Sequence, residues 1–155
     1  MSDKKRIEGI IDVGGKPNVS RTAVATGTIR LQEKTFSAIK NNEIKKGDVI
    51  EASTIAVIQA VKDTPRIIPH CHIVPIEGGS VDWTFEEQNL RCTVKVSANY
   101  RTGVEMEALV GVSAGLLCVY DMVKSYEKDD SGQYPETRIN DIKVLSKKKT
   151  DLGEF

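Results

Sequence analysis

The stretch that decides the fold runs from Thr102 to Glu127 and reads TGVEMEALVGVSAGLLCVYDMVKSYE. Thr102 followed three residues later by Glu105 has the spacing of a capping box, in which two side chains satisfy free N–H groups at a helix start. The uncharged residues behind it predict one long, largely buried helix that ends near Glu127. The apolar part, Ala108 to Tyr120, is too short to span a bilayer.

The remaining patterns predict strands and two shorter helices around this helix. Asp48 followed by Glu51 predicts a second capping box, and the helix behind it should run to about Lys62 because Pro65 stops it. A short helix is expected at 34–40. Strands are expected at 23–31, 67–76 (irregular), 81–85, 90–96 and 138–145, with a hairpin turn at 87–89 and a polar tail from residue 147. This order favours an α+β fold with an antiparallel sheet and helices on one face.

Length and composition indicate one domain over residues 1–155, with flexible ends at 1–11 and 148–155. The 22 basic and 22 acidic residues give no net charge, so nothing steers the chain toward nucleic acid or a membrane. An anionic ligand would need a local cluster of Lys and Arg. Three widely spaced cysteines are a poor disulfide framework, and no apolar segment follows the charged N-terminus, so we expect a reduced, cytoplasmic protein.

Four segments in register carry a family resemblance. They are KGDV (46–49), IPHCH (68–72), TGVEMEAL (102–109) and YDMVK (120–124). From about Asp12 to Phe155 the chain resembles the molybdenum cofactor biosynthesis protein C family. The resemblance implies a cyclic pyranopterin monophosphate synthase: a lyase that converts (8S)-3',8-cyclo-7,8-dihydroguanosine 5'-triphosphate to cyclic pyranopterin monophosphate and pyrophosphate.

The resemblance also implies a ferredoxin-like sheet with additional elements and a homohexamer, a trimer of dimers with sites near a dimer interface. The small-residue helix from Ala108 to Gly115 is consistent with packing against its own copy. No protein-bound cofactor is implied, although Mg²⁺ can accompany the substrate triphosphate. The implied partner is a nucleotide-derived small molecule, and neither nucleic acid nor membrane.

The matching segments assign roles to individual residues. Proton transfer falls to Lys46, Asp121 and Lys124. The pterin-forming end of the substrate falls to His72, Glu107 and Glu105, and the phosphates fall to Arg21, Lys62 and Lys147. Cys71 and Met106 lie inside the matching segments and are included among the substrate-binding residues.

Simpler interpretations exist for several of these residues. Without the resemblance, Asp121 and Lys124, spaced i and i+3, would be interpreted as a surface ion pair, which is common on helices. Glu105 is explained as a helix cap, Lys62 as a cation in the last turn of its helix, and Lys147–Lys149 as a solvated run.

Two other functions compete with the enzyme. A zinc module would use His70 and His72, on one face of an extended segment, with a carboxylate or Cys92 as third ligand. An RNA-binding ferredoxin-like domain is disfavoured by the zero net charge and the 5% aromatic content.

The sequence departs from the family pattern at three places. Arg101 stands where a lysine is expected, and arginine keeps the charge but is a poor proton shuttle. Asp151 stands where another lysine is expected, so Lys148 or Lys149 is the candidate to replace it. Ser53–Val57 replaces a segment richer in arginine and glycine.

Overall fold

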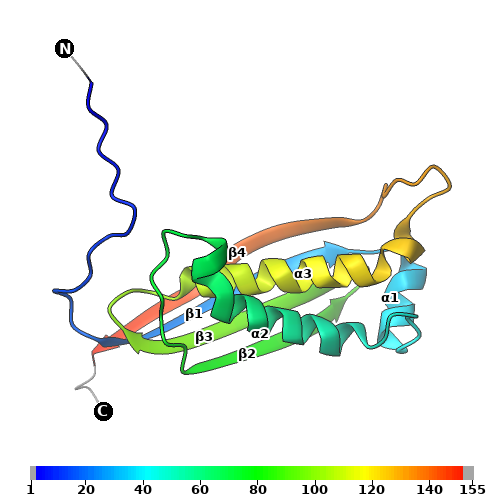
Figure 1. The fold of residues 1–155 in the computed structure, drawn as a ribbon. Helices are drawn as coiled ribbons and strands as arrows, with labels where there is room; N and C mark the ends of the chain where they lie inside the picture. The colour runs from blue at the N-terminus through cyan, green and yellow to red at the C-terminus, as the bar shows by residue number, and fades with distance from the viewer. Residues whose placement is uncertain (1–2, 152–155) are drawn as a thin grey trace.

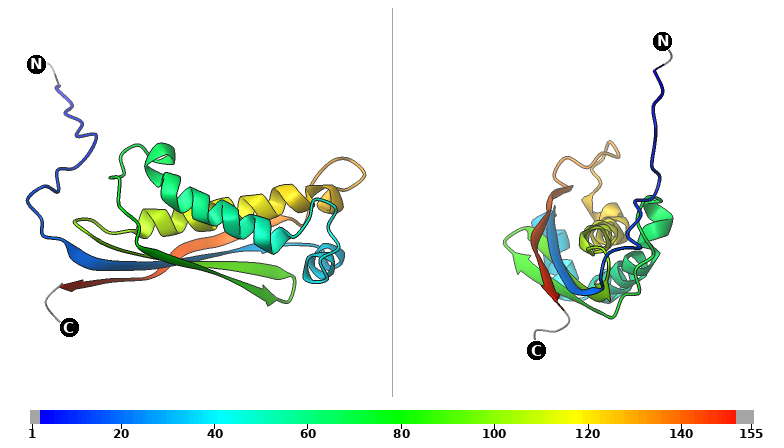
Figure 2. Two further views of the ribbon diagram at one scale, coloured as in Figure 1. Left: turned by 60° about the horizontal axis from the view of Figure 1, so that its bottom comes forward. Right: turned by 90° about the vertical axis from the view of Figure 1, so that its left-hand side faces the viewer.

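The computed structural model describes residues 3–151 as one four-stranded antiparallel sheet covered on one face by two long helices (Figures 1 and 2). The elements in chain order are β1 (Val19–Arg30), α1 (Glu33–Lys40), α2 (Val49–Ile67), β2 (Gly78–Glu86), β3 (Asn89–Tyr100), α3 (Glu105–Glu127) and β4 (Arg138–Asp151). The strand order is β2-β3-β1-β4. The predicted α+β class is confirmed, and the order is that of a split βαβ, ferredoxin-like sheet with α1 as an addition.

The core lies between the sheet and α3, because the central strands alternate inward apolar residues with outward polar ones. The inward side chains of β1 and β3 meet a buried stripe on α3, formed by Ala108, Val112, Leu116, Val119 and Val123. Gly27 of β1 makes this approach possible, since a Cβ there would lie 2.9 Å from Val112 Cγ1 and Leu116 Cδ1. Helix α3 is long and apolar enough to cross a membrane, but half of that window is buried inside this protein.

Two of the small residues of α3, Gly111 and Gly115, pack against α2 within the chain. A Cβ on Gly111 would lie 2.8 Å from Val61 Cγ2, and one on Gly115 would lie 2.6 Å from Val57 Cγ2, both side chains of α2. These two glycines allow α2 and α3 to pack closely, because a side chain at either position would clash with α2. Packing of the partly exposed Ser113 and Ala114 against a second copy stays a prediction.

The helix starts were predicted with mixed success. The Asp48 carboxylate accepts a hydrogen bond of 2.9 Å from the Glu51 N–H, so the cap of α2 is confirmed. The capping box at Thr102 is wrong, because α3 starts at Glu105 behind an N-cap residue, Val104, whose side chain caps nothing. Burial of Val104 in the core fixes the start of α3 instead.

The segment after α2 also differs from its prediction. Pro65 lies inside α2, which continues to Ile67. A proline so near the end removes one helical hydrogen bond, and the Thr64 hydroxyl donates to the Ala60 carbonyl beside it. The predicted strand at 67–76 is wrong, since a turn and irregular backbone connect α2 to β2.

The last strand is longer than predicted. β4 continues to Asp151 and pairs with β1 over its whole described length. The prediction of a polar tail from Lys147 is therefore wrong for residues 147–151. Propensity alone missed this because lysines are poor strand formers and β1 supplies the pairing. Residues 1–2 and 152–155 lie outside the described residues, and so do the parts of the predicted flexible ends that fall there.

Candidate active site

Lys46, Asp121 and Lys124 meet on the surface of α3. Lys46 reaches over from the loop before α2, and its Nζ donates to Asp121 Oδ2 and to the Asp121 carbonyl, both at 3.1 Å. Lys124 Nζ lies 3.2 Å from Asp121 Oδ1, one turn further along the helix. One carboxylate thus holds two ammonium groups, which is more than the surface i,i+3 pair of the simpler interpretation.

The two ammonium groups keep Asp121 ionised. Hydrogen bonds from Lys46 and then Lys124 lower the pKa of the Asp121 carboxyl from its ordinary value. The side chain of Asp121 is 59 % exposed although α3 packs one face into the core, so this cluster lies at the solvent-facing surface of the helix. Asp121 therefore acts as an anion that orders two cations at the solvent edge.

A second cluster forms at the opposite end of α3. Lys147 Nζ, on β4, lies 2.7 Å from Glu105 Oε1 in the first turn of the helix. A cavity of about 250 Å³ opens beside this pair, lined by Arg21, Thr22, Gly103–Glu105 and Lys147–Lys149. Partial burial of Glu105 opposes ionisation, but Lys147, a backbone N–H and Arg21 together hold the pKa of Glu105 below its ordinary value. Glu105 is thus an ion-pair partner and not a cap.

The strand register decides which lysine joins Lys147. Arg21 is opposite Lys149 in the β1–β4 pairing, and Ala23 is opposite Lys147. Because faces alternate along a strand, Lys147 and Lys149 share the face of Arg21, whereas Lys148 projects to the other side. Arg21 and Lys149 are like charges placed directly opposite, an arrangement that is destabilising without an anion between them. The Nε of Arg21 is also buried without a hydrogen-bond partner among residues 3–151.

Glu107 is the buried carboxyl of the site. It is 4 % exposed, and burial raises its pKa, with a further rise from the neighbouring Glu105 and an opposing hydrogen bond from its own N–H. Cys71 is close enough for the charge of Glu107 to add to the effect of burial in raising the pKa of the Cys71 thiol. A buried carboxyl with a raised pKa at a polar cluster is a candidate proton carrier, a role the sequence did not suggest for it.

Both histidines hold the N-terminal segment. His70 Nδ1 lies 2.6 Å from the Gly9 carbonyl and His72 Nε2 lies 2.5 Å from the Ile11 carbonyl. A carbonyl only accepts, so each of these nitrogens carries the proton. Contact of His72 with a substrate ring would then use Nδ1, or would require residues 9–11 to move.

This geometry does not favour the zinc module. His70 and His72 lie in a turn and in irregular backbone, and Cys92 is fully buried in the core, where burial raises the pKa of its thiol to about 12. Within the described part of the chain, no group of three or more His, Cys, Asp or Glu side chains could hold a metal ion.

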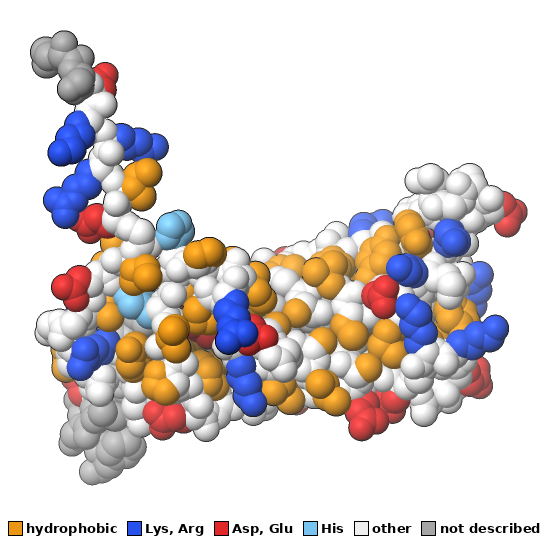
Figure 3. Space-filling model, viewed as in Figure 1, with side chains coloured by type: hydrophobic (Ala, Val, Ile, Leu, Met, Phe, Trp, Pro, Cys, Tyr) orange, Lys and Arg blue, Asp and Glu red, His pale blue; other side chains and the backbone are white. Residues whose placement is uncertain are grey.

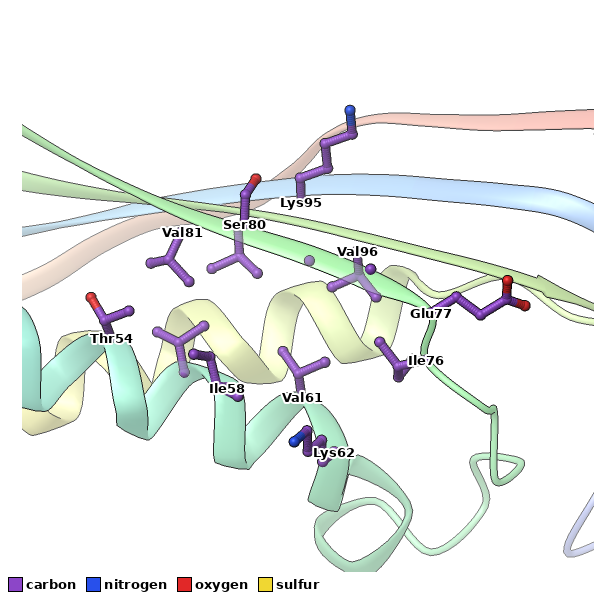
Figure 4. A pocket seen from close by; sticks show the side chains of 14 residues that line it. Thr54, Ile58, Val61, Lys62, Ile76, Glu77, Ser80, Val81, Lys95 and Val96 are labelled. Carbon is purple, nitrogen blue, oxygen red and sulfur yellow. The ribbon is translucent and has the colours of Figure 1, made fainter.

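Lys62 and Met106 belong to neither ion-pair cluster. Lys62 lies on α2 at the edge of an apolar hollow of about 320 Å³ between α2 and strands β2 and β3. In Figure 4, Val81 and Val96 face Ile58 and Val61 of α2 across this hollow. Because α2 ends at Ile67, Lys62 is not in its last turn, and that simpler explanation does not apply. Met106 is an exposed residue of the first turn of α3.

The two clusters are too far apart to serve one substrate within one chain. Glu105 and Asp121 are sixteen residues apart on the same helix, which corresponds to about 24 Å along its axis. Proton transfer and charge pairing both need direct contact at about 3 Å. The chain therefore presents two separate clusters, named here the acid–base cluster (Lys46, Asp121, Lys124) and the anion cluster (Arg21, Glu105, Lys147, Lys149).

Comparison with known proteins adds an independent line of argument. Residues 10–150 match the MoaC family. A protein of Methanospirillum hungatei JF-1, 50 % identical over 143 residues that cover 92 % of each chain, is named probable cyclic pyranopterin monophosphate synthase. A Thermococcus kodakarensis protein of the same name is 50 % identical over 147 residues, 95 % of this chain and 94 % of its own. A relative from Methanothermobacter thermautotrophicus, 48 % identical over 151 residues (97 % of this chain and 94 % of its own), is named probable cyclic pyranopterin monophosphate synthase accessory protein.

Proposed function

Because this chain belongs to the MoaC family, we propose that it is a cyclic pyranopterin monophosphate synthase acting in molybdenum cofactor biosynthesis. Its substrate is the cyclised dihydroguanosine triphosphate, and its products are cyclic pyranopterin monophosphate and pyrophosphate, which makes it a lyase. The observation that carries the proposal is the pair of ammonium groups held on the single carboxylate of Asp121. That arrangement suits a reaction driven by proton transfer and positioning.

The acid–base cluster performs the ring rearrangement. Lys46 and Lys124 carry mobile protons, and the ionised Asp121 fixes where both of them lie. Glu107, whose pKa is raised by burial, is a further candidate proton carrier. His72, Cys71 and Met106 lie near the same end of α3 as Glu107, beside the anion cluster and about 21 Å along the helix from Asp121. In a site built from two copies, these residues therefore contact the pterin-forming part from the second chain.

The anion cluster holds the phosphates. Arg21, Lys147 and Lys149 share one face of the β1–β4 pair, and the opposed Arg21 and Lys149 are relieved of repulsion when an anion binds between them. Fixed positive charge also stabilises the charge that develops as the cyclic phosphate closes and pyrophosphate leaves. Lys62 is a further phosphate contact. No protein-bound cofactor is needed, and any Mg²⁺ would enter as part of the triphosphate substrate.

The complete site contains residues of two copies of the chain. The separation of about 24 Å along α3 is bridged when a second copy, running in the opposite direction, places its anion cluster beside the acid–base cluster of the first. Exposed apolar side chains of α2 and α3 are available for subunit contact (Figure 3): Ile55 and Leu117 are 62 and 60 % exposed. Such exposure is typical of surfaces that pack in an assembly. A hexamer built as a trimer of dimers, working in the cytoplasm, is the form we propose.

A turnover assay tests the function. Purified protein is mixed with the cyclised triphosphate, and pyrophosphate and the fluorescent pterin product are followed together. Equal amounts of both products are expected from the wild type. Lys124→Ala should lower kcat by at least about a hundredfold, while the matched Lys128→Ala, an exposed lysine one turn further on, should not change it. Release of pyrophosphate without pterin, or full activity of Lys124→Ala, would overturn the proposal.

A further inference from the structure

Lys46 is carried by a tight turn. The Gly47 N–H donates to the Ile44 carbonyl at 3.0 Å, so Lys45 and Lys46 are the two central residues of that turn. Ile44 is buried and anchors the start of the turn in the core. Gly47 has φ +118°, a conformation that favours glycine, and it lets the chain pass directly into the capped start of α2.

The hydroxyl of Tyr126 fastens this turn to α3. The Lys45 N–H donates to Tyr126 Oη at 2.9 Å, and the half-buried ring of Tyr126 packs against the core. The neighbouring Lys46 then reaches back to Asp121 on the same helix. Lys46 is thus tied to α3 twice, at its backbone through Lys45 and at its tip. Tyr126 and Asp121 are five residues apart, about 7.5 Å along the helix axis.

The turn needs such a tie because little else orders the cluster. The side chains of Lys46, Asp121 and Lys124 are 50, 59 and 51 % exposed, so core packing does not hold them. A lysine side chain also has a flexible four-carbon stem. A misplacement of about 1 Å at a reacting group can cost about a hundredfold in rate. The hydrogen bond at Lys45 narrows the positions that the Lys46 ammonium can take.

We propose that Tyr126 is a positioning residue, which acts on the reaction through Lys46 by accepting the N–H of Lys45. This inference rests on the proposed function, in which Lys46 transfers a proton. The Tyr126 hydroxyl accepts the Lys45 N–H and makes no other hydrogen bond within residues 3–151.

The test replaces the hydroxyl alone. Tyr126→Phe keeps the packed ring and leaves the Lys45 N–H without its acceptor, so kcat should fall about fivefold, the equivalent of one ordinary hydrogen bond, while KM stays within about twofold. Tyr134→Phe is the matched control, because the Tyr134 ring packs edge-on to Tyr120 and its hydroxyl makes no hydrogen bond within residues 3–151. Kinetics of the control should equal those of the wild type.

A second background separates positioning from a general loss of stability. Lys46→Arg alone should lower kcat. Tyr126→Phe should then lower kcat by a clearly smaller factor in the Lys46→Arg background than in the wild type, because both changes act through the position of the side chain at residue 46. An unchanged kcat, a raised KM with kcat intact, or the same fall in both backgrounds would overturn the positioning role. Full turnover by Lys46→Ala would instead overturn the catalytic assignment on which the inference rests.

Discussion

Glu127 is the most deeply buried charged side chain among residues 3–151, and its replacement tests the account of what holds this fold together. Its carboxylate is fully buried and accepts hydrogen bonds from the Gln32 N–H at 2.9 Å, the Thr35 hydroxyl at 2.5 Å and the Thr137 hydroxyl at 2.9 Å. Gln32 is the N-cap residue of α1 and its own side chain caps nothing there. Glu127, from the end of α3, therefore caps α1 across the fold.

Glu127→Ala leaves three buried donors without their acceptor. Each unsatisfied buried donor costs about 1–3 kcal/mol, so we expect the free energy of unfolding to fall by about 4 kcal/mol. For a chain of this size, that corresponds to a melting temperature lower by about 8–16 °C. Glu127→Gln keeps one acceptor oxygen and should lose roughly half as much.

The assay is thermal and urea unfolding of the wild type, both Glu127 variants and Glu136→Ala, at one fixed subunit concentration because association shifts apparent stability. Glu136 is an exposed glutamate of the loop before β4 and should tolerate alanine. A loss of less than about 1 kcal/mol in Glu127→Ala would refute the reasoning, since it would mean that the three donors find other partners.

Three further changes test packing, phosphate binding and burial. Gly115→Val places a Cβ 2.6 Å from Val57 Cγ2 and should lower the free energy of unfolding by about 1–3 kcal/mol, measured in urea. Lys149→Ala should raise KM in the turnover assay by about tenfold while Lys148→Ala leaves it unchanged, and equal effects would contradict the strand register. Burial raises the pKa of Glu107, so the folded protein keeps a proton there that the unfolded chain has released above pH 4.5, and the contribution of Glu107 to stability falls as pH rises. Glu107→Gln removes the group that titrates. The free energy of unfolding of the variant, measured in urea, should therefore rise relative to that of the wild type between pH 4.5 and pH 7. A difference between the two proteins that is the same at both pH values would contradict the assignment.

Sequence could predict the parts of the fold that depend on local patterns of residues. The hairpin of β2 and β3, the cap at Asp48 and the length of the apolar helix α3 all follow from periodicity and capping chemistry. The errors arose where tertiary contact overrides local preference. Pairing with β1 draws Lys147–Asp151 into a strand, and burial of Val104 moves the start of α3.

The candidate site was likewise predicted where neighbours in sequence carry it and missed where distant segments meet. The i,i+3 spacing placed Asp121 and Lys124 together, and the family resemblance added Lys46. Sequence could not indicate that Arg21 of β1 and Lys147 of β4 meet Glu105 at one end of α3, because these contacts join three separate elements. It also missed the hydrogen bonds of both histidines to residues 9 and 11, because that contact joins segments sixty-one residues apart.

The most direct test of the central claim is subunit complementation. Lys46→Ala removes the acid–base cluster and Arg21→Ala weakens the anion cluster, so each variant alone should turn over the cyclised triphosphate poorly. Unfolding and refolding an equal mixture of the two should yield mixed dimers in which one of the two sites combines intact halves. The account predicts that activity returns to about a quarter of the wild-type value, since half of the dimers are mixed and each holds one intact site. Activity no higher than the average of the two variants would contradict a site built from two copies of the chain.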